Sequence, residues 1–492
     1  MISQDTITDV PIPVIHKRLC EGSLSYSELI GIVSKSIELH EKSIRAFLTL
    51  TIEDARQEAE RRDKKKLKPT TSLSGIPISV KDSLTTKDIR TTAASKILDS
   101  FIPPYDATSC ARLKEQGTII VGKTNMDEFA HGFTTEYSAF HETRNPWHTR
   151  MAPGGSSGGA AASVATRECL LALATENFGS IIQPASLCGV VGMKPTYGRS
   201  SRYGIIAMTS SLECPGIVGR CVEDVAIGID AISGFDPLDA TSVSKTKPSF
   251  YKNLSRDISG MKIALIKPIM EKIDNDIVKV IESTTDIFKQ LGAEIEVRSW
   301  YDLTVDADIY DILYRAEVSS NLARYDGIRF GHSGDRSKTL DFFYKTSRNV
   351  FGKHVKRQIT TDPITLGEGT DNIYTDALRQ RRKNRDYIDR IFKEVDAIIT
   401  PATAFTSLEI GQIHDQTWRE NNRHLSQITS AMVCPTVLFG YPSISFPIGF
   451  INNMPIGLNM YAKRFNEQAL FNLGFSFQEE SGLKCLKPNL KP

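Results

Sequence analysis

The chain has 492 residues, 40% hydrophobic and 24% charged, a composition typical of a globular protein that excludes a disordered or collagen-like chain. Sixty Lys and Arg against 58 Asp and Glu give a formal net charge of +2, too balanced to imply a nucleic-acid or membrane surface by itself. Residues 1–19 lack the apolar stretch of a signal peptide and no run approaches the ~20 apolar residues of a membrane span, so we expect a cytoplasmic protein.

Eight cysteines and nine histidines are scattered along the chain. They form no CxxC pair and no HExxH motif, and no carboxylates cluster beside the histidines. This pattern is not typical of a disulfide framework or a zinc site. We therefore expect reduced thiols, no metal site and no cofactor held by this chain.

The N-terminal pattern predicts two helices and a strand. Residues 27–48 carry apolar side chains at spacings that suit an amphipathic helix. Residues 53–66, EDARQEAERRDKKK, are nearly all polar and predict a surface helix. Residues 74–80, SGIPISV, predict a buried strand that runs up to Lys81.

Helix and strand patterns then alternate, which predicts an α/β sheet with helices on both faces. The alternating segments are 107–117 (helix), 118–122 (strand), 154–165 (helix after a glycine-rich start), 169–174 (strand) and 222–234 (helix). Residues 262–299 predict a strand, helix, strand unit.

The last third begins with a more helical and more charged stretch, 306–393, which we expect to cover a site. Strand patterns at 396–401, 443–450 and 454–462 precede a final helix at 465–482. The length admits about three domains of roughly 150 residues, but one α/β domain over 1–492 is simpler. We expect it to comprise N-terminal helices (1–70), a core (71–235), a βαβ unit with the helical cover (236–400) and C-terminal strands with a helix (401–492).

The glycine-rich stretch 153–162, PGGSSGGAAA, admits several interpretations. A phosphate-binding loop would need Lys after its last glycine, but Ala160 follows Gly159. The GxSxG motif of hydrolases matches when centred on Ser156 or Ser157, but the preceding residues do not resemble a core strand. A Gly/Ser loop without chemistry remains open for this stretch alone.

Four stretches in sequence order together resemble the amidase signature family. They are residues 75–98, 103–130, 145–165 and 179–204. Through SKIL, PPYDAT, GKTNMDEFA, NPW and KPTYGRSSRYG, the chain is most similar to the branch formed by the A subunits of glutamyl-tRNA(Gln) and aspartyl-tRNA(Asn) amidotransferases. The resemblance covers nearly the whole chain and implies the family's fold, a large mixed β-sheet covered by helices on both faces.

The resemblance also implies a Lys, Ser, Ser triad formed by Lys81, Ser156 and Ser180. In the family, the residue at Ser180 attacks an amide carbonyl, the one at Ser156 relays the proton, and the lysine is the base. A lysine, with an ordinary pKa of ~10.4, can do this at neutral pH only if burial or positive charge lowers its pKa. Without the two serines, Lys81 paired with Asp82 or another carboxylate would be the simpler interpretation.

The nucleophile segment TENFGSIIQPA departs from the family's usual SDTGGSIRQPA mainly at Glu176, Asn177, Phe178 and Ile182. The resemblance implies that backbone N–H groups of Asn177, Phe178 and Gly179 form the oxyanion hole. If position 178 needs a left-handed backbone, Phe178 adds roughly 1–2 kcal/mol of strain. Glu176 adds a methylene in a tight place, and Ile182 removes a guanidinium.

Substrate-binding positions are also altered. By alignment with the family, Arg381 grips the substrate carboxylate, although it could equally be one charge of a solvated RQRRKNR face. The position of the family's aspartate, which holds the α-amine, falls at Ser430, or at Gln427 if the register slips by a turn. Either neutral side chain would weaken glutamine binding by about 1–2 kcal/mol. Phe133 stands where the family has a small residue, so we expect a reshaped pocket.

Three functions follow from these observations. The resemblance implies an A subunit that hydrolyses glutamine and passes ammonia to a B subunit, which uses ATP and Mg on glutamyl-tRNA, with a small C subunit around the pair. The second hypothesis is a stand-alone amidase acting on another small amide. The third is a catalytically impaired paralogue that acts as a scaffold or binding protein.

Overall fold

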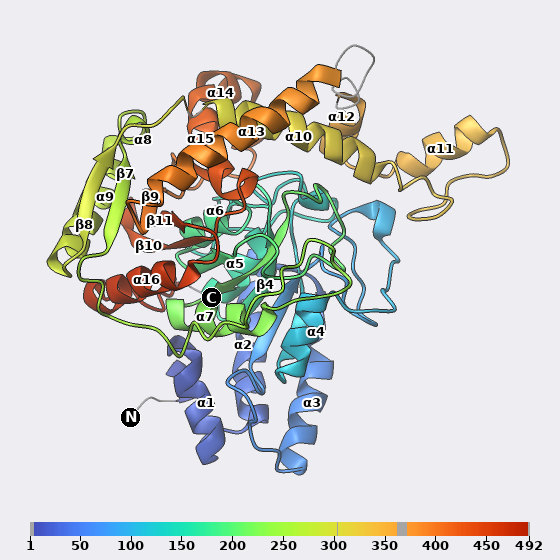
Figure 1. The fold of residues 1–492 in the computed structure, drawn as a ribbon. Coiled ribbons are helices and arrows are strands. Elements are labelled where there is room, and N and C mark those ends of the chain that lie inside the picture. Colours follow the sequence, from blue (N-terminus) through green and yellow to red (C-terminus); the bar gives the residue numbers. More distant parts are fainter. Residues whose placement is uncertain (1–3, 303, 362–370, 491–492) are drawn as a thin grey trace.

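A computed structural model describes residues 4–302, 304–361 and 371–490. At its centre lies an 11-stranded sheet with the order β1-β3-β2-β4-β6-β5-β10-β11-β9-β7-β8 (Figure 1). The strands are β1 (Phe47–Leu50), β2 (Pro77–Lys81), β3 (Ile119–Thr124), β4 (Leu171–Glu176), β5 (Val191–Lys194), β6 (Cys214–Gly219), β7 (Lys262–Ile266), β8 (Glu294–Arg298), β9 (Ala397–Pro401), β10 (Ser443–Ile451) and β11 (Met454–Ala462).

The sheet is mixed. Strands β3, β2 and β4 are parallel neighbours, as are β9, β7 and β8, and all other neighbours are antiparallel. The predicted strand, helix, strand unit is β7, α9 (Asn275–Gln290) and β8, with its two strands paired in parallel. The expectation of a large mixed sheet is therefore confirmed.

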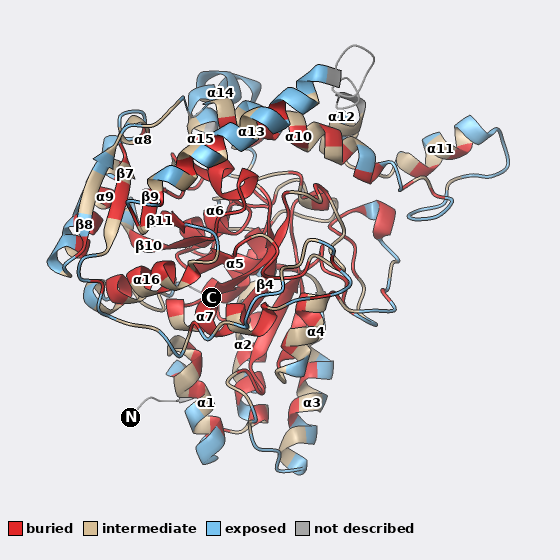
Figure 2. Cartoon of the chain, viewed as in Figure 1, coloured by how far each residue is buried: buried red, intermediate tan, exposed pale blue. Residues whose placement is uncertain are grey.

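Helices surround the sheet (Figure 1). Besides α9, the α-helices are α1 (Ile12–Glu21), α2 (Tyr26–Ile44), α3 (Ile52–Lys64), α4 (Thr108–Glu115), α5 (Gly158–Ala165), α6 (Ile182–Cys188), α7 (Val222–Ile232), α8 (Lys267–Met270), α10 (Thr304–Leu322), α11 (Leu340–Arg348), α12 (Lys353–Thr361), α13 (Asp371–Ile391), α14 (Gln416–Asn421), α15 (Arg423–Leu438) and α16 (Glu467–Ser481). Figure 2 shows that α5 and the strands beside it are buried, whereas the outer helices carry exposed faces.

Both faces of the sheet are covered, and strand β6 shows why the packing is close. A Cβ at Gly216 would lie 2.7 Å from the Cδ1 of Ile181, just before α6. The side chain of the next strand residue, Ile217, packs against α7. A Cβ at Gly228 of α7 would lie 2.8 Å from the Cγ2 of Ile217. Successive strand residues point to opposite faces, so α6 and α7 lie on opposite sides of the sheet, as predicted.

The predicted helix 27–48 ends earlier than expected. Ser25 and Glu28 form a capping box at the start of α2, but the helix ends at Ile44 because Arg45 adopts a left-handed backbone with φ of 59°. Phe47 then begins β1, which pairs with β3. The apolar residues near 47 that fitted a helical period therefore belong to a strand.

The described part of the chain lacks three features. None of its helices is long and apolar enough to cross a membrane. It contains no group of three or more His, Cys, Asp and Glu side chains placed to hold a metal ion. Its eight cysteines are all free thiols.

Candidate active site

Lys81, Ser156 and Ser180 come together at one edge of the sheet. Lys81 is the last residue of β2, Ser156 lies just before α5, and Ser180 lies between β4 and α6. Because β2 and β4 are parallel neighbours, their carboxyl ends meet at the same edge. The Nζ of Lys81 donates a hydrogen bond to the Oγ of Ser156 at 2.8 Å, and that Oγ donates to the Oγ of Ser180 at 3.0 Å. A continuous chain of hydrogen bonds thus joins the three side chains predicted as the triad.

The environment of Lys81 favours the neutral amine. The side chain is fully buried, and loss of solvent lowers its pKa from 10.5 to about 7. The buried carboxyl groups of Glu176, Asp127 and Glu213 oppose this shift. A substantial fraction of Lys81 is therefore neutral at physiological pH and able to accept a proton.

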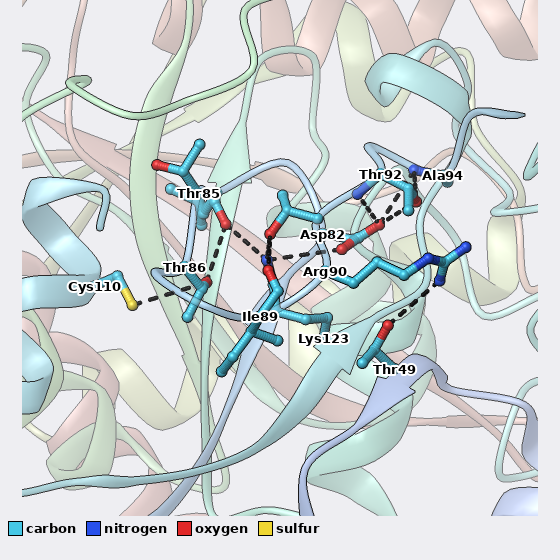
Figure 3. A network of polar contacts seen from close by, with 12 residues as sticks. Thr49, Asp82, Thr85, Thr86, Ile89, Arg90, Thr92, Ala94, Cys110 and Lys123 are labelled. Atoms are coloured by element: carbon cyan, nitrogen blue, oxygen red, sulfur yellow. Dashed lines mark hydrogen bonds and ion pairs between the residues drawn. The ribbon is translucent and has the colours of Figure 1, made fainter. Parts of the chain in front are cut away.

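The carboxylate next to Lys81 in sequence has a different partner. Figure 3 shows Asp82 within a buried polar network, where its Oδ2 accepts hydrogen bonds from the backbone of Thr92 at 2.9 Å and Ala94 at 3.4 Å. Its Oδ1 lies 3.7 Å from the Nζ of Lys123. Burial raises the pKa of Asp82, and Lys123 opposes the shift. The pairing of Lys81 with Asp82 that the sequence left open is not formed.

Replacing Lys123 by methionine should destabilise the fold strongly. Both members of the Lys123 and Asp82 pair are completely buried, and removing the cation leaves an uncompensated carboxylate. We expect the free energy of unfolding in urea to fall by about 3–5 kcal/mol. The exposed ion pair of Lys289 with Asp286 provides the matched control, because Lys289→Met should cost less than about 1 kcal/mol. Equal effects of the two substitutions would contradict this prediction.

The backbone at Phe178 is not strained. In the turn between β4 and α6, the residue with positive φ is Gly179, at +81°, and Phe178 is not left-handed. A Cβ at Gly179 would also lie 2.4 Å from the Nε2 of Gln183. The position that needs a positive φ is therefore occupied by glycine. Because Phe178 does not have to adopt a left-handed backbone, it adds no backbone strain.

Glu176 has a role that the sequence did not predict. Its carboxylate accepts hydrogen bonds from the backbone N–H groups of Ser180 at 2.8 Å, Ile181 at 2.6 Å and Ile182 at 3.3 Å. These N–H groups lead into α6, and no backbone carbonyl among the described residues accepts a hydrogen bond from them. The extra methylene relative to aspartate thus belongs to a side chain that fixes the start of the helix. Ile182, the first residue of α6, is buried.

Two N–H groups of the turn remain available for an oxyanion. Among the described residues, none accepts a hydrogen bond from the backbone N–H of Phe178 or Gly179. The side-chain Oδ1 of Asn177 accepts a hydrogen bond from the Tyr310 hydroxyl at 2.7 Å, and its amide donates to Thr209. Asn177 therefore ties the turn to α10 by its side chain, and the hole role of all three residues stays a prediction.

Helix α10 covers the turn. The rings of Phe178 and Tyr310 are stacked with centroids 4.4 Å apart and an interplanar angle of 29°. Helix α10 in turn packs against α12, α13 and α15. Of the helical segment expected to cover a site, α10 thus lies against the turn that holds Ser180.

An aromatic pocket of about 270 Å³ lies beside the turn. Phe133 and Phe178, both of which depart from the family's usual residues, line this same pocket. The other lining residues are Tyr137, Gln183, Phe405, Ile413, Trp418, Arg419, Asn422, Arg423, Leu425 and Thr429. The sequence pattern gave no sign of these contributions, because the segments involved are far apart along the chain. Phe133 and Phe178 thus lie in one pocket, and a reshaping of that pocket relative to the family stays a prediction.

The structure does not bring the other predicted substrate-binding residues into this pocket. Arg381 donates from Nε to the backbone carbonyl of Leu438 at 2.6 Å and lines a separate cleft of about 410 Å³. Among the described residues, no side chain lines both cavities. Gln427 is exposed and lines a third cavity, and half-buried Ser430 does not line the aromatic pocket, whereas its neighbour Thr429 does. Roles for these residues in substrate binding stay predictions.

Comparisons with known proteins find relatives that match nearly the whole chain. The Amidase family pattern matches residues 28–471. The A subunit of the glutamyl-tRNA(Gln) amidotransferase of Pediococcus pentosaceus is 39% identical over 487 residues, which cover 98% of this chain and 99% of that protein. The crystal structure of the corresponding A subunit of glutamyl-tRNA(Gln) amidotransferase from Thermotoga maritima matches with a TM-score of 0.81 and 32% identity, covering 100% of this chain and 99% of that one. Peptide amidase from Stenotrophomonas maltophilia matches with a TM-score of 0.83 and 25% identity, covering 98% and 99%.

Proposed function

This chain belongs to the Amidase family, and we propose that it is the A subunit of a glutamyl-tRNA(Gln) amidotransferase that hydrolyses glutamine to supply ammonia. Similarity to such A subunits over nearly the whole chain supports the assignment to this branch. The observation that carries the chemistry is the buried hydrogen-bond chain from Lys81 through Ser156 to Ser180.

In the proposed reaction, Ser180 is the nucleophile. Its hydroxyl proton passes to Ser156 as the Ser156 proton passes to neutral Lys81, which needs only rotation of the two hydroxyl groups. The Oγ of Ser180 bonds to the amide carbon, and the oxyanion that forms accepts hydrogen bonds from the N–H groups of Phe178 and Gly179. The C–N bond then breaks, and the proton returns along the same path to the departing ammonia. Water cleaves the acyl-enzyme ester and gives glutamate.

The ammonia would be used by partner subunits. We propose a B subunit that binds ATP and Mg and activates the glutamyl group on tRNA, and a small C subunit that wraps the pair. The near-neutral charge of this chain supports the placement of most RNA contacts on a partner. A cytoplasmic location stays a prediction from the sequence.

The test is glutamine-dependent conversion of glutamyl-tRNA by this chain assembled with B and C subunits from the same source. We expect ammonia release from glutamine to rise when the partners, glutamyl-tRNA and ATP are present. A complex that assembles and uses free ammonium salts but not glutamine would show that the transamidating partner works while this chain supplies no ammonia. That outcome would refute the glutaminase assignment.

A second function, a stand-alone amidase on another small amide, is favoured by one observation. The pocket beside the turn is lined by five aromatic side chains and by no acidic residue among those described, so the α-ammonium group of a free amino acid would be desolvated there without a counter-charge. Ammonia release from diverse amides by the isolated chain would distinguish this function from a partner-dependent one. The intact hydrogen-bond chain argues against a scaffold without activity.

A further inference from the structure

We propose that the aromatic pocket accepts the acyl side chain of a primary amide that carries an aromatic ring and a terminal carboxylate. The inference rests on the proposed role of Ser180 as nucleophile and adds a substrate class beyond glutamine. Phe178 and Gln183 line the pocket and lie two positions before and three positions after Ser180 in the sequence. Ser180 therefore lies in the same turn as two of the lining residues, and the inference places the acyl group bonded to its Oγ against their side of the pocket.

The pocket walls favour a flat apolar group. Phe133, Tyr137, Phe178, Phe405 and Trp418 present ring surfaces to the cavity. Aromatic pairs are stabilised by offset or edge-to-face contact in addition to the burial of apolar area. A volume of about 270 Å³ is large enough for a single substituted benzene ring.

Two of the rings are held in place by their surroundings. The Phe178 ring is stacked on Tyr310. Tyr137 is stacked on His354 with centroids 4.0 Å apart, and its backbone N–H donates to the buried Asp127 carboxylate at 3.1 Å. The pocket is therefore formed before a ligand arrives, and binding does not require these side chains to be ordered.

The charges at the pocket select a negative group. Arg419 and Arg423 line it, and neither forms an ion pair with a described residue. None of the described lining residues is acidic, so the α-ammonium group of glutamine would find no counter-charge there. A carboxylate on the ligand would instead meet two guanidinium groups, which bind carboxylates with charge-assisted hydrogen bonds.

The reaction on such an amide is the hydrolysis already described and needs no further reactant except water. The Oγ of Ser180 bonds to the carbonyl carbon, the C–N bond breaks, and ammonia leaves with the proton returned from Lys81. Water then releases the aromatic acid and restores the serine. The reaction is a hydrolysis in which electrons and protons balance, so it needs no oxidant or reductant.

Three probes that share the phenylacetamide scaffold test the inference with the full chain. They are phenylacetamide, the same amide with a para-carboxylate, and the same amide with a para-trimethylammonium group. Calorimetric binding to the Ser180→Ala chain should follow the order carboxylate, neutral, cation, with about tenfold or more between the first and last. The unmodified chain should release ammonia from the carboxylate probe with at least about tenfold higher kcat/KM than from glutamine.

Amino-acid substitutions test whether the carboxylate probe binds in the aromatic pocket. Phe133→Ala should weaken binding of the carboxylate probe about tenfold, whereas Phe330→Ala, which removes an exposed ring elsewhere, should not change it. Because removing the half-buried Phe133 ring can disturb folding, Arg419→Gln with Arg423→Gln provides a second measurement on exposed side chains, and it should abolish the preference for the anionic probe.

The outcomes separate this inference from the proposed function. Glutamine hydrolysis without binding or cleavage of any aromatic amide would overturn the inference and leave the glutaminase role intact. Binding of the carboxylate probe to the Ser180→Ala chain, with no ammonia released from any amide by the unmodified chain either alone or assembled with its B and C subunits, would support the pocket assignment and refute the role of Ser180. Equal binding of the three probes would overturn the proposed charge selection.

Discussion

Replacing Ser180 by alanine should lower kcat for amide hydrolysis by at least about 10⁴-fold. The substitution removes the atom that bonds to the carbonyl carbon, and the neighbouring Ser156 hydroxyl is held by hydrogen bonds between Ser180 and Lys81. What remains is stabilisation by the N–H groups of the turn. We would measure ammonia release under saturating substrate and the acyl-enzyme burst, both of which should disappear.

The control for Ser180→Ala is the adjacent serine of the glycine-rich loop. Ser157 donates from Oγ to the backbone carbonyl of Thr175 at 3.2 Å, and its side chain makes no hydrogen bond to the triad side chains among the described residues. Ser157→Ala should therefore lose about one hydrogen bond, or roughly 1 kcal/mol of stability, and reduce kcat less than about tenfold. If Ser157→Ala abolished hydrolysis and Ser180→Ala did not, the nucleophile would have been misassigned.

The sequence predicts the sheet well where one local signal is sufficient. The apolar run before Lys81 predicted a buried strand, and β2 is buried along its whole length. The helical period at 27–48 predicted α2 but extended it too far, because the left-handed backbone of Arg45 leaves little trace in the pattern of apolar residues. The antiparallel pairing of β5 with β6 has no local signature, since short buried strands depend on partners distant in sequence.

The candidate site also contains residues that the sequence predicted and contacts that it did not predict. Resemblance to a family placed Lys81, Ser156 and Ser180 in one site, and the geometry joins them. The same alignment gave Arg381 a role in substrate binding, yet its side chain lines a different cleft. An alignment predicts which residue occupies a position, but it does not predict the conformation of a long side chain. The contact of Phe178 with Tyr310 depends on how α10 crosses the turn, which no local pattern encodes.

Lys81→Met should reduce kcat/KM for amide hydrolysis by about 10³–10⁴-fold, because it removes the base while keeping an unbranched apolar chain of similar length. Only the neutral amine accepts a proton, so kcat/KM of the unmodified chain should rise with pH through about 7 and level off above it. The residual activity of the methionine variant should lack this rise. A pH profile unchanged by the substitution would exclude Lys81 as the base.

Stability distinguishes this loss of activity from misfolding. Burial lowers the pKa of Lys81 from 10.5 in the unfolded chain to about 7 in the folded one, so the unfolded state binds more protons between these values. The contribution of Lys81 to the free energy of unfolding therefore increases from pH 7 to 10.5, and below pH 7 the buried cation destabilises the fold fully. Lys81→Met removes this penalty, so at pH 6 the variant should unfold in urea at a denaturant concentration equal to or above that of the unmodified chain. An inactive variant that is at least as stable as its parent assigns Lys81 to chemistry, whereas a less stable one would indicate that its hydrogen bond to Ser156 holds the site together.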